Sequence, residues 1–405
     1  MKALLAVSWA MPPMLFPRSV QVSRTLMALS RRGWEITVVC GDLQSTTYID
    51  PSLEKLYGGC YKTIRVMNAE AADISPDLLM LQWLKPAVSG IRTLLGAGKR
   101  FSTLLTFAQP WVDHLIGLEV RKIAKMPWIA HFSDPWVDGL YYADVGKKLL
   151  KSWRKMEKDI IQEADVVLFT NSQAVDLVMR KYPPAWKEKV GVIPHGYDAS
   201  LAKSTGPTPA SGSRLRMVYT GDLYGKRTAW GLFQALGILS QVSLQDQIEI
   251  VFVGRTSPEH HQMVNDLGLS GIITFNDQVP YVKSLEVAAG ADVLLVIDAP
   301  SSTPSPFLPS KLVDYLMFKK PILGLTPQDG ASADLLRRLG CPVIPPDDPL
   351  SIAKALSNMI ESWCGGSLAV SQEFGQVAMT YDIDQTGRLL DKVLTQVADR
   401  HANIW

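Results

Sequence analysis

The chain has 405 residues, 47% of them hydrophobic, which is enough apolar material for two domain cores. Its formal net charge of +2 gives no general electrostatic case for a nucleic-acid partner, so we expect none. The four cysteines form no CxxC pair, which argues against a zinc site or a disulfide framework and fits a reducing cytoplasm.

In the first half of the chain, short aliphatic runs alternate with helical patterns. Val22, Leu26 and Leu29 recur at helical spacing, and Gly33 ends that helix. Such alternation is typical of a parallel sheet covered by helices on both faces, so we predict a Rossmann-like domain at 1–197. Its expected strands are Ala3 to Ser8, Glu35 to Cys40, Leu104 to Ala108, Trp128 to Phe132, Val166 to Thr170 and Val190 to Pro194.

A change of composition divides the chain. Residues 198–213 are rich in Ser, Thr, Pro and Gly and show no apolar period, so we predict a linker. The alternation restarts in a second Rossmann-like domain at 214–383. A final helix at 384–405 follows a complete sheet; it could close either domain, and we expect it on the N-terminal one. The second set of expected strands is Met217 to Thr220, Ile248 to Val253, Ile272 to Phe275, Val293 to Ile297 and Pro321 to Leu325.

The predicted fold is therefore α/β, with two doubly wound parallel sheets. Ligands of such sheets bind at the carboxyl ends of strands, so we expect a site in a cleft between the domains. Asp134, Gly221 and the pair Gly254-Arg255 each follow a predicted strand. Glycine there permits close approach by a phosphate or a base, although plain turn geometry is the alternative explanation.

The segment from Pro306 to Leu323 sets a lysine and an acid three residues apart at a helix start. We expect Ser310 to cap this helix, so that its amides and Lys311 together suit a diphosphate. Asp314 falls on the same face, where a carboxylate can accept the hydroxyls of a ribose. The alternative is an ordinary amphipathic helix with a solvated Lys and Asp.

Across nearly its whole length the chain resembles the retaining glycosyltransferases of family 4, which have the two-domain GT-B architecture. No single match is specific, whereas the order and spacing of the matches are. The pieces that carry the resemblance are Pro17 to Leu26 with Gly33 to Cys40, His131-Phe-Ser-Asp-Pro-Trp136, Thr170-Asn-Ser172, Val192-Ile-Pro-His-Gly-Tyr-Asp198, Tyr219-Thr-Gly-Asp-Leu223, Phe252-Val-Gly254, and Pro309 to Leu316 with Lys320 to Leu323.

The donor-binding pieces depart from the family pattern in two ways. The family pairs two glutamates eight residues apart, whereas this chain has Pro306 at the first position and Asp314 at the second. Its usual Gly-Arg-Leu has become Gly-Asp-Leu at 221–223. Arg227 stands at the usual lysine position and is the expected cation, with Lys226 as the substitute candidate.

The first loop also departs from the pattern, because prolines replace the customary glycine pair at 11–17. Proline donates no amide hydrogen bond, so we assign this loop and Arg18 to the acceptor side. His114 and Asp134 are the other acceptor-side candidates, as groups that orient the incoming hydroxyl. A surface histidine and a helix cap or turn acid are their respective alternatives.

The resemblance implies transfer of a sugar from a nucleoside diphosphate donor to a glycan or lipid-linked acceptor, with retention, in surface polysaccharide or glycoconjugate assembly. Arg227, Lys311 and Asp134 are the expected catalytic residues. Gly221, Gly254, Arg255, Ser310 and Asp314 are expected to bind the donor. UDP is slightly favoured over GDP, and neither a cofactor nor a metal is expected.

Two alternatives remain, namely a nucleotide-sugar epimerase of the same fold and a catalytically silent binding subunit, the latter suggested by Pro306.

One segment bears on location. Residues 147–158 hold six basic residues against one acid, with apolar residues interleaved, and this pattern suits contact with an anionic membrane surface. The alternative is a helix whose apolar stripe packs on the sheet while its lysines face solvent. The protein is thus expected to be cytoplasmic, with peripheral contact at the inner face of a membrane as one possibility.

Overall fold

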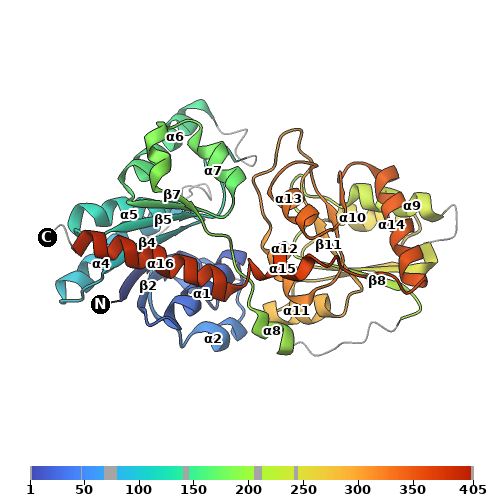
Figure 1. Ribbon diagram of the computed structural model, residues 1–405, viewed down its shortest axis with the longest axis horizontal. Helices are drawn as coiled ribbons and strands as arrows, with labels where there is room; N and C mark the ends of the chain where they lie inside the picture. Colours follow the sequence, from blue (N-terminus) through green and yellow to red (C-terminus); the bar gives the residue numbers. More distant parts are fainter. Residues whose placement is uncertain are drawn as a thin grey trace. The chain divides into compact units, whose positions relative to one another are not determined.

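The computed structural model describes residues 2–46, 48–67, 80–139, 146–204, 212–240 and 245–402. The chain folds as two compact units (Figure 1). Unit 1 comprises Met1–Gly196 together with Ile383–Trp405, and unit 2 comprises Tyr197–Asp382. Unit 1 is thus built from both ends of the chain.

Unit 1 contains a sheet of seven strands, all parallel, in the order β3-β2-β1-β4-β5-β6-β7. The strands are β1 Ala3–Val7, β2 Glu35–Gly41, β3 Lys62–Val66, β4 Thr103–Ala108, β5 Trp128–Phe132, β6 Val166–Phe169 and β7 Val190–Val192. The helices are α1 Pro17–Ser30, α2 Ser52–Tyr57, α4 Leu84–Gly96, α5 Val112–Ile123, α6 Lys147–Glu163, α7 Ser172–Met179 and α16 Ile383–Ala402, with 3-10 turns η1 Leu43–Ser45, η2 Met80–Trp83 and η4 Pro184–Lys189.

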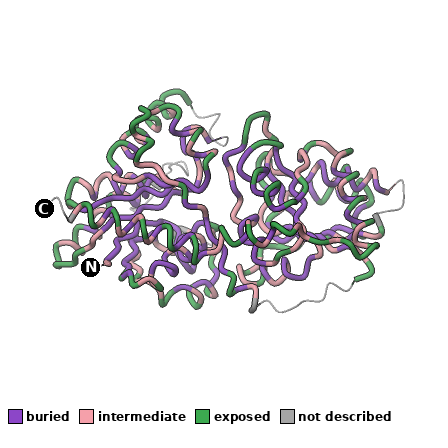
Figure 2. The backbone as a smooth tube through the Cα atoms, viewed as in Figure 1, coloured by how far each residue is buried: buried purple, intermediate pink, exposed green. Residues whose placement is uncertain are grey.

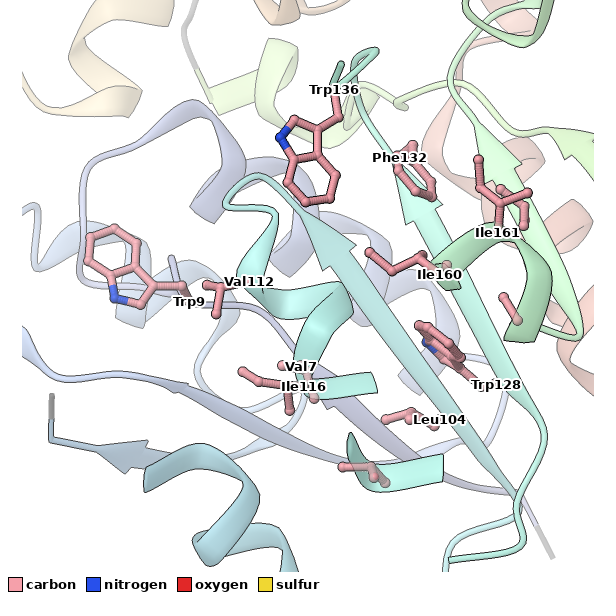
Figure 3. Packing of buried hydrophobic residues seen from close by; sticks show 14 of the residues in the cluster. Val7, Trp9, Leu104, Val112, Ile116, Trp128, Phe132, Trp136, Ile160 and Ile161 are labelled. Atoms are coloured by element: carbon pink, nitrogen blue, oxygen red, sulfur yellow. The ribbon is translucent and has the colours of Figure 1, made fainter. Parts of the chain in front are cut away.

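The central strands β1, β4 and β5 of unit 1 are buried at every position because both faces of the sheet are covered. Leu4 and Ala6 of β1 pack in a cluster with α1 and α16. The next residues along, Leu5 and Val7, point the other way into a cluster with α4, α5 and α6. Figure 3 shows part of this second cluster, and Figure 2 shows the strands buried inside the exposed outer faces of the helices.

The C-terminal helix α16 lies alongside α1 in unit 1 (Figure 1). A Cβ on Gly387 would come within 2.7 Å of the Cβ of Ala28, so the two helices approach closely. Asp391 accepts hydrogen bonds from Lys2 Nζ at 2.8 Å and Trp34 Nε1 at 2.7 Å. The last helix of the chain is therefore hydrogen-bonded to the residues that directly precede β1 and β2.

Unit 2 contains a sheet of six strands, all parallel, in the order β10-β9-β8-β11-β12-β13. The strands are β8 Leu215–Thr220, β9 Ile248–Val253, β10 Ile273–Asn276, β11 Val293–Ile297, β12 Ile322–Leu325 and β13 Val343–Ile344. The helices are α8 Ala199–Ser204, α9 Trp230–Ser240, α10 Pro258–Asp266, α11 Tyr281–Ala289, α12 Ser310–Tyr315, α13 Ala331–Arg338, α14 Pro349–Cys364 and α15 Phe374–Met379, with η5 Gln245–Gln247 and η6 Leu316–Phe318.

The structure differs from the sequence predictions at the sheet edges and at the linker. The edge strands β3 and β13 were not predicted, because β3 alternates polar and apolar residues and β13 has only two residues. The predicted linker at 198–213 begins with helix α8. Asp198 starts it by accepting from the amide of Ser200 at 3.0 Å, and Leu201 is buried. Residues 205–211 lie outside the described part of the chain.

Candidate functional site

Two glycines end neighbouring strands of unit 2, Gly221 after β8 and Gly254 after β9. Both have positive φ, of 107° and 140°. A Cβ on Gly254 would lie 2.5 Å from the carbonyl oxygen of Gly221, so a side chain at 254 would push the two turns apart. The pair forms a narrow backbone edge at the carboxyl ends of β8 and β9, and its role in donor binding stays a prediction.

The side chain of Lys311 reaches this edge from α12. A Cβ on Gly221 would come within 2.7 Å of its Nζ, which also lies 3.6 Å from the centroid of the Tyr219 ring. The Nζ is buried and has no hydrogen-bond partner among the residues that the structure describes. Burial, and then repulsion by Arg227, lower the pKa of Lys311 well below its ordinary value. A buried ammonium without an acceptor is costly, so this position has unused capacity for an anion.

Arg227 supplies a second cation. Its NH2 lies 3.4 Å from Oδ1 of Asp298, and its guanidinium carbon lies 5.1 Å from the centroid of the Tyr224 ring. The Arg227 side chain is 12% exposed and that of Asp298 is 4% exposed. Lys311, Arg227 and Asp298 form a cluster of two bases and one acid. The charge of Asp298 offsets that of Arg227, so the cluster carries a net positive charge when Lys311 is protonated.

Asp222, which stands where the family pattern has arginine, is paired with Arg255. Its Oδ2 accepts from Nε of Arg255 at 2.8 Å, and its Oδ1 accepts from the Arg255 amide at 2.9 Å. The acid and the base therefore pair across the two glycine turns. Arg255, predicted to bind the donor, has a 57% exposed side chain that is engaged with Asp222.

The structure corrects one detail of helix α12. Ser310 is its first helical residue, and the cap position is taken by Pro309, which makes no side-chain cap hydrogen bond. The prediction that Ser310 caps the helix is thus wrong, because the preceding proline already turns the chain into it. Asp314 is 8% exposed, and its Oδ2 accepts from the hydroxyl of Tyr281 at 3.1 Å.

In unit 1, Arg18 lies at the carboxyl ends of the central strands. Its NH2 is 3.3 Å from Nδ1 of His131, and its guanidinium carbon is 5.4 Å from the centroid of the Phe107 ring. Burial lowers its pKa to about 10, against the attraction of Asp134 and Asp113. Arg18 and Asp134, two of the predicted acceptor-side residues, are therefore electrostatic neighbours.

His114 is fully buried, unlike the surface histidine considered as its alternative. Its Nδ1 lies 2.7 Å from Oγ1 of Thr106, and its ring packs 4.4 Å from that of Phe132. Burial lowers its pKa well below the ordinary value. With no exposed surface in this conformation, the ring is held within the interior of unit 1, and its predicted contact with an acceptor would require a rearrangement.

The basic segment 147–158 forms most of α6. Leu150, Trp153 and Met156 pack against the core, as an ordinary covering helix would, while Leu149 is 39% exposed. No helix among the described residues combines the length and apolar character that a membrane span requires. Membrane contact through this segment stays a prediction.

Glu157, the one acid of that segment, is fully buried and ties α6 to two other segments. Its carboxylate accepts from Nζ of Lys181 at 2.5 Å, from the hydroxyl of Tyr182 at 2.7 Å and from the amide of Val137 at 3.1 Å. Lys181 also pairs with Asp138. This cluster fixes the turn after β5, which carries Asp134.

Sequence reasoning did not select three buried polar residues at the carboxyl ends of strands. His131 and His195 have ring centroids 5.9 Å apart beside Arg18, and Asp298 directly follows β11. A polar residue at the end of an apolar strand is the signal that picked out Asp134, and it would have picked out Asp298 too. Within the described residues, no group of three or more His, Cys, Asp or Glu side chains could hold a metal ion.

Comparison with known proteins identifies the fold. No protein-family model matches the chain, and a search of curated proteins finds no match. Among solved structures, sucrose-phosphate synthase from Thermosynechococcus elongatus is similar with a TM-score of 0.74 at 16% identity, covering 98% of this chain and 99% of that one. HepE from Anabaena in complex with UDP-glucose is similar with a TM-score of 0.69 at 15% identity, covering 97% and 99%.

A third solved structure, provisionally assigned as a UDP-N-acetylglucosamine 2-epimerase from Listeria monocytogenes, has a TM-score of 0.59 at 11% identity and covers 96% of this chain and 94% of its own. At such identities the likeness concerns the fold alone. Together with two parallel sheets of seven and six strands, it shows that this chain has the two-domain GT-B fold.

Proposed function

We propose that the protein is a glycosyltransferase that moves a sugar from a nucleoside diphosphate donor to an acceptor hydroxyl. The observation that carries the proposal is the buried Nζ of Lys311, which lies beside the Gly221 turn and has no hydrogen-bond partner in the described part of the chain. Arg227 adds a second cation to the same cluster. A diphosphate supplies the negative charge and the acceptor oxygens that would pair with the Nζ of Lys311, and the guanidinium of Arg227 can bind the same group.

In this proposal the cations stabilise the leaving group. The bond from the anomeric carbon to the β-phosphate oxygen breaks while a bond to the acceptor oxygen forms on the same face of the sugar. The acceptor proton passes to the departing diphosphate, which gives retention without an enzymic nucleophile. Lys311 and Arg227 neutralise the negative charge that develops on the diphosphate, an effect that is strong in a buried site.

The donor we favour is a UDP-sugar. HepE, one of the similar structures, is in complex with UDP-glucose. In this chain Asp314, held by Tyr281, is the carboxylate we assign to the ribose hydroxyls. Gly221 and Gly254 would let the nucleotide approach the backbone. Ser310 and Arg255 stay on the donor side of the proposal as peripheral contacts.

The acceptor side of the proposal lies in unit 1. Arg18 and Asp134 would orient the acceptor hydroxyl, with His114 behind them. We propose a glycan or lipid-linked acceptor, in surface polysaccharide or glycoconjugate assembly and within family 4. Exposed basic residues on α6 would hold the protein at an anionic membrane surface.

A nucleotide panel tests the proposal. A ligand present at 100 times its Kd adds about 2.7 kcal/mol of stability. Because we favour a UDP-sugar as the donor, we expect UDP to raise the melting temperature of the protein more than GDP, ADP, dTDP or CMP does. The matching UDP-sugar should then be consumed when a glycan acceptor is added, and more slowly without one. If no nucleoside diphosphate shifts the transition, the proposal is wrong.

The second candidate function is epimerisation of a nucleotide sugar. It is favoured by the likeness to the structure provisionally assigned as a UDP-N-acetylglucosamine 2-epimerase. The products separate the two candidates, since an epimerase converts one sugar nucleotide into another without any acceptor. Binding with no chemistry at all would indicate the silent subunit that the proline at 306 suggests.

Diphosphate binding should also take up protons. The pKa of Lys311 is depressed by burial and by Arg227, against the attraction of Asp298 and Asp222, so the free site holds the proton of Lys311 less tightly than water does. A bound diphosphate favours the ammonium and raises this pKa, so UDP affinity should fall as pH rises from the depressed pKa of the free site to the higher pKa of the complex. Calorimetry in buffers of different ionisation enthalpy measures the uptake. Lys311→Arg, which stays charged, should take up less; equal uptake would contradict the assignment.

A further inference from the structure

Asp298 is a buried carboxylate among the cations of unit 2, and the proposed function leaves it without a role. Its Oδ1 lies 3.4 Å from NH2 of Arg227, while no described residue forms a hydrogen bond with its Oδ2. Burial raises the pKa of Asp298, and Arg227 and the nearby hydroxyl of Ser332 act against this rise. That hydroxyl donates its one hydrogen to the carbonyl of Phe307 at 3.1 Å. The Oδ2 of Asp298 is therefore able to accept a hydrogen bond from a ligand.

A diphosphate would compete with Asp298 for Arg227. The guanidinium binds phosphate strongly, so donor binding would draw Arg227 away from the carboxylate. Asp298 would then be a buried charge beside two phosphates, which is costly unless new donors pair with it. A carboxylate with a purely structural role would therefore oppose the ligand that the cluster is proposed to bind.

A nucleotide sugar carries the missing donors, because its ring hydroxyls follow directly after the diphosphate. We infer that Asp298 binds the transferred sugar of the donor, accepting a hydrogen bond from one of its hydroxyls. This inference rests on the proposed function. Since bare UDP lacks those hydroxyls, Asp298 favours the sugar nucleotide over the spent nucleotide, which helps the product to leave after transfer.

The inference is tested by measuring Kd with calorimetry for bare and sugar-bearing nucleotides. The probes are UDP with UDP-glucose and GDP with GDP-glucose, and the pair used is the one whose nucleotide binds the unmodified protein more tightly. In Asp298→Leu, which has no acceptor, we expect the sugar nucleotide to bind about 10- to 100-fold more weakly. Bare nucleotide should bind equally well or more tightly. Asp298→Asn, which keeps a neutral acceptor, should fall between.

Asp222→Asn is the matched control. Asp222 also attracts Lys311, but its carboxylate is paired with Arg255. Its loss should therefore change the affinities for bare and sugar-bearing nucleotide by the same factor. The inference is overturned if both Asp298 variants weaken the binding of bare and sugar-bearing nucleotide by the same factor, or if they change neither affinity. Asp298 would then only balance the charge of the neighbouring cations. If the unmodified protein binds no nucleoside diphosphate, the proposed function is wrong and the inference falls with it.

Discussion

Lys311→Met should abolish most nucleotide binding and turnover while making the free protein more stable. Methionine is unbranched and only one atom shorter than lysine, but it removes the charge that pairs with the diphosphate. Loss of one such electrostatic contact typically lowers turnover by about 100- to 1,000-fold. The same change removes a buried amino group that, among the described residues, has no hydrogen-bond partner, so the free energy of unfolding should rise by about 1–3 kcal/mol.

Two measurements check this prediction, namely the melting temperature with and without UDP and the initial rate with a UDP-sugar. Lys283→Met is the control, because Lys283 is exposed and pairs with Glu286 three residues along the helix. It should change the free energy of unfolding by no more than a few tenths of a kcal/mol and leave the UDP-induced shift and the initial rate unchanged. An unaltered UDP-induced shift in Lys311→Met would place the diphosphate elsewhere.

Lys181→Met should be the most destabilising change in unit 1 among those considered. It removes the cation that pairs with Glu157, a fully buried carboxylate at 2.5 Å. Breaking a buried ion pair leaves an uncompensated charge and costs about 3–5 kcal/mol. Because the Lys181 side chain is 25% exposed, water relieves part of this cost, and we expect about 3 kcal/mol. Urea unfolding followed by tryptophan fluorescence measures the change.

The origin of the effect can be isolated with a second substitution. Adding Glu157→Gln to Lys181→Met removes the unpaired charge while an amide oxygen still accepts from Val137, so at least half of the lost stability should return. Lys155→Met breaks an exposed pair with Asp159 on the same helix and should cost less than about 1 kcal/mol. A Lys181→Met cost no larger than that of Lys155→Met would show that the buried cluster contributes nothing.

The sheets could be predicted from the sequence wherever strands are buried on both faces. A strand such as β1, Ala-Leu-Leu-Ala-Val, must be apolar at every position and therefore stands out. The edge strand β3, Lys-Thr-Ile-Arg-Val, is partly exposed and resembles many loops. Helix α8 was missed because its start depends on Asp198 binding the Ser200 amide, a local contact within a segment of turn-like composition.

For the candidate site, the sequence could indicate which residues follow strands but not what they contact. Lys311 and Gly221 were selected separately, and only the fold brings the Nζ of one against the turn of the other. The pairing of Asp222 with Arg255 likewise joins turns after two strands. Ser310 is a residue type that favours the N-cap position, but in the structure Pro309 takes that position and Ser310 is the first helical residue. The local sequence therefore predicted the start of this helix only to within one residue.

The attachment of α16 to unit 1 has a consequence for synthesis on the ribosome. The first 196 residues emerge long before the helix that covers one face of their sheet, and all of unit 2 is translated in between. At about 5–20 residues per second, that face waits on the order of 10–40 s with its leucines uncovered. A nascent unit 1 would therefore need a chaperone or transient self-association to shield it, and a fragment ending at Gly196 should aggregate when expressed alone.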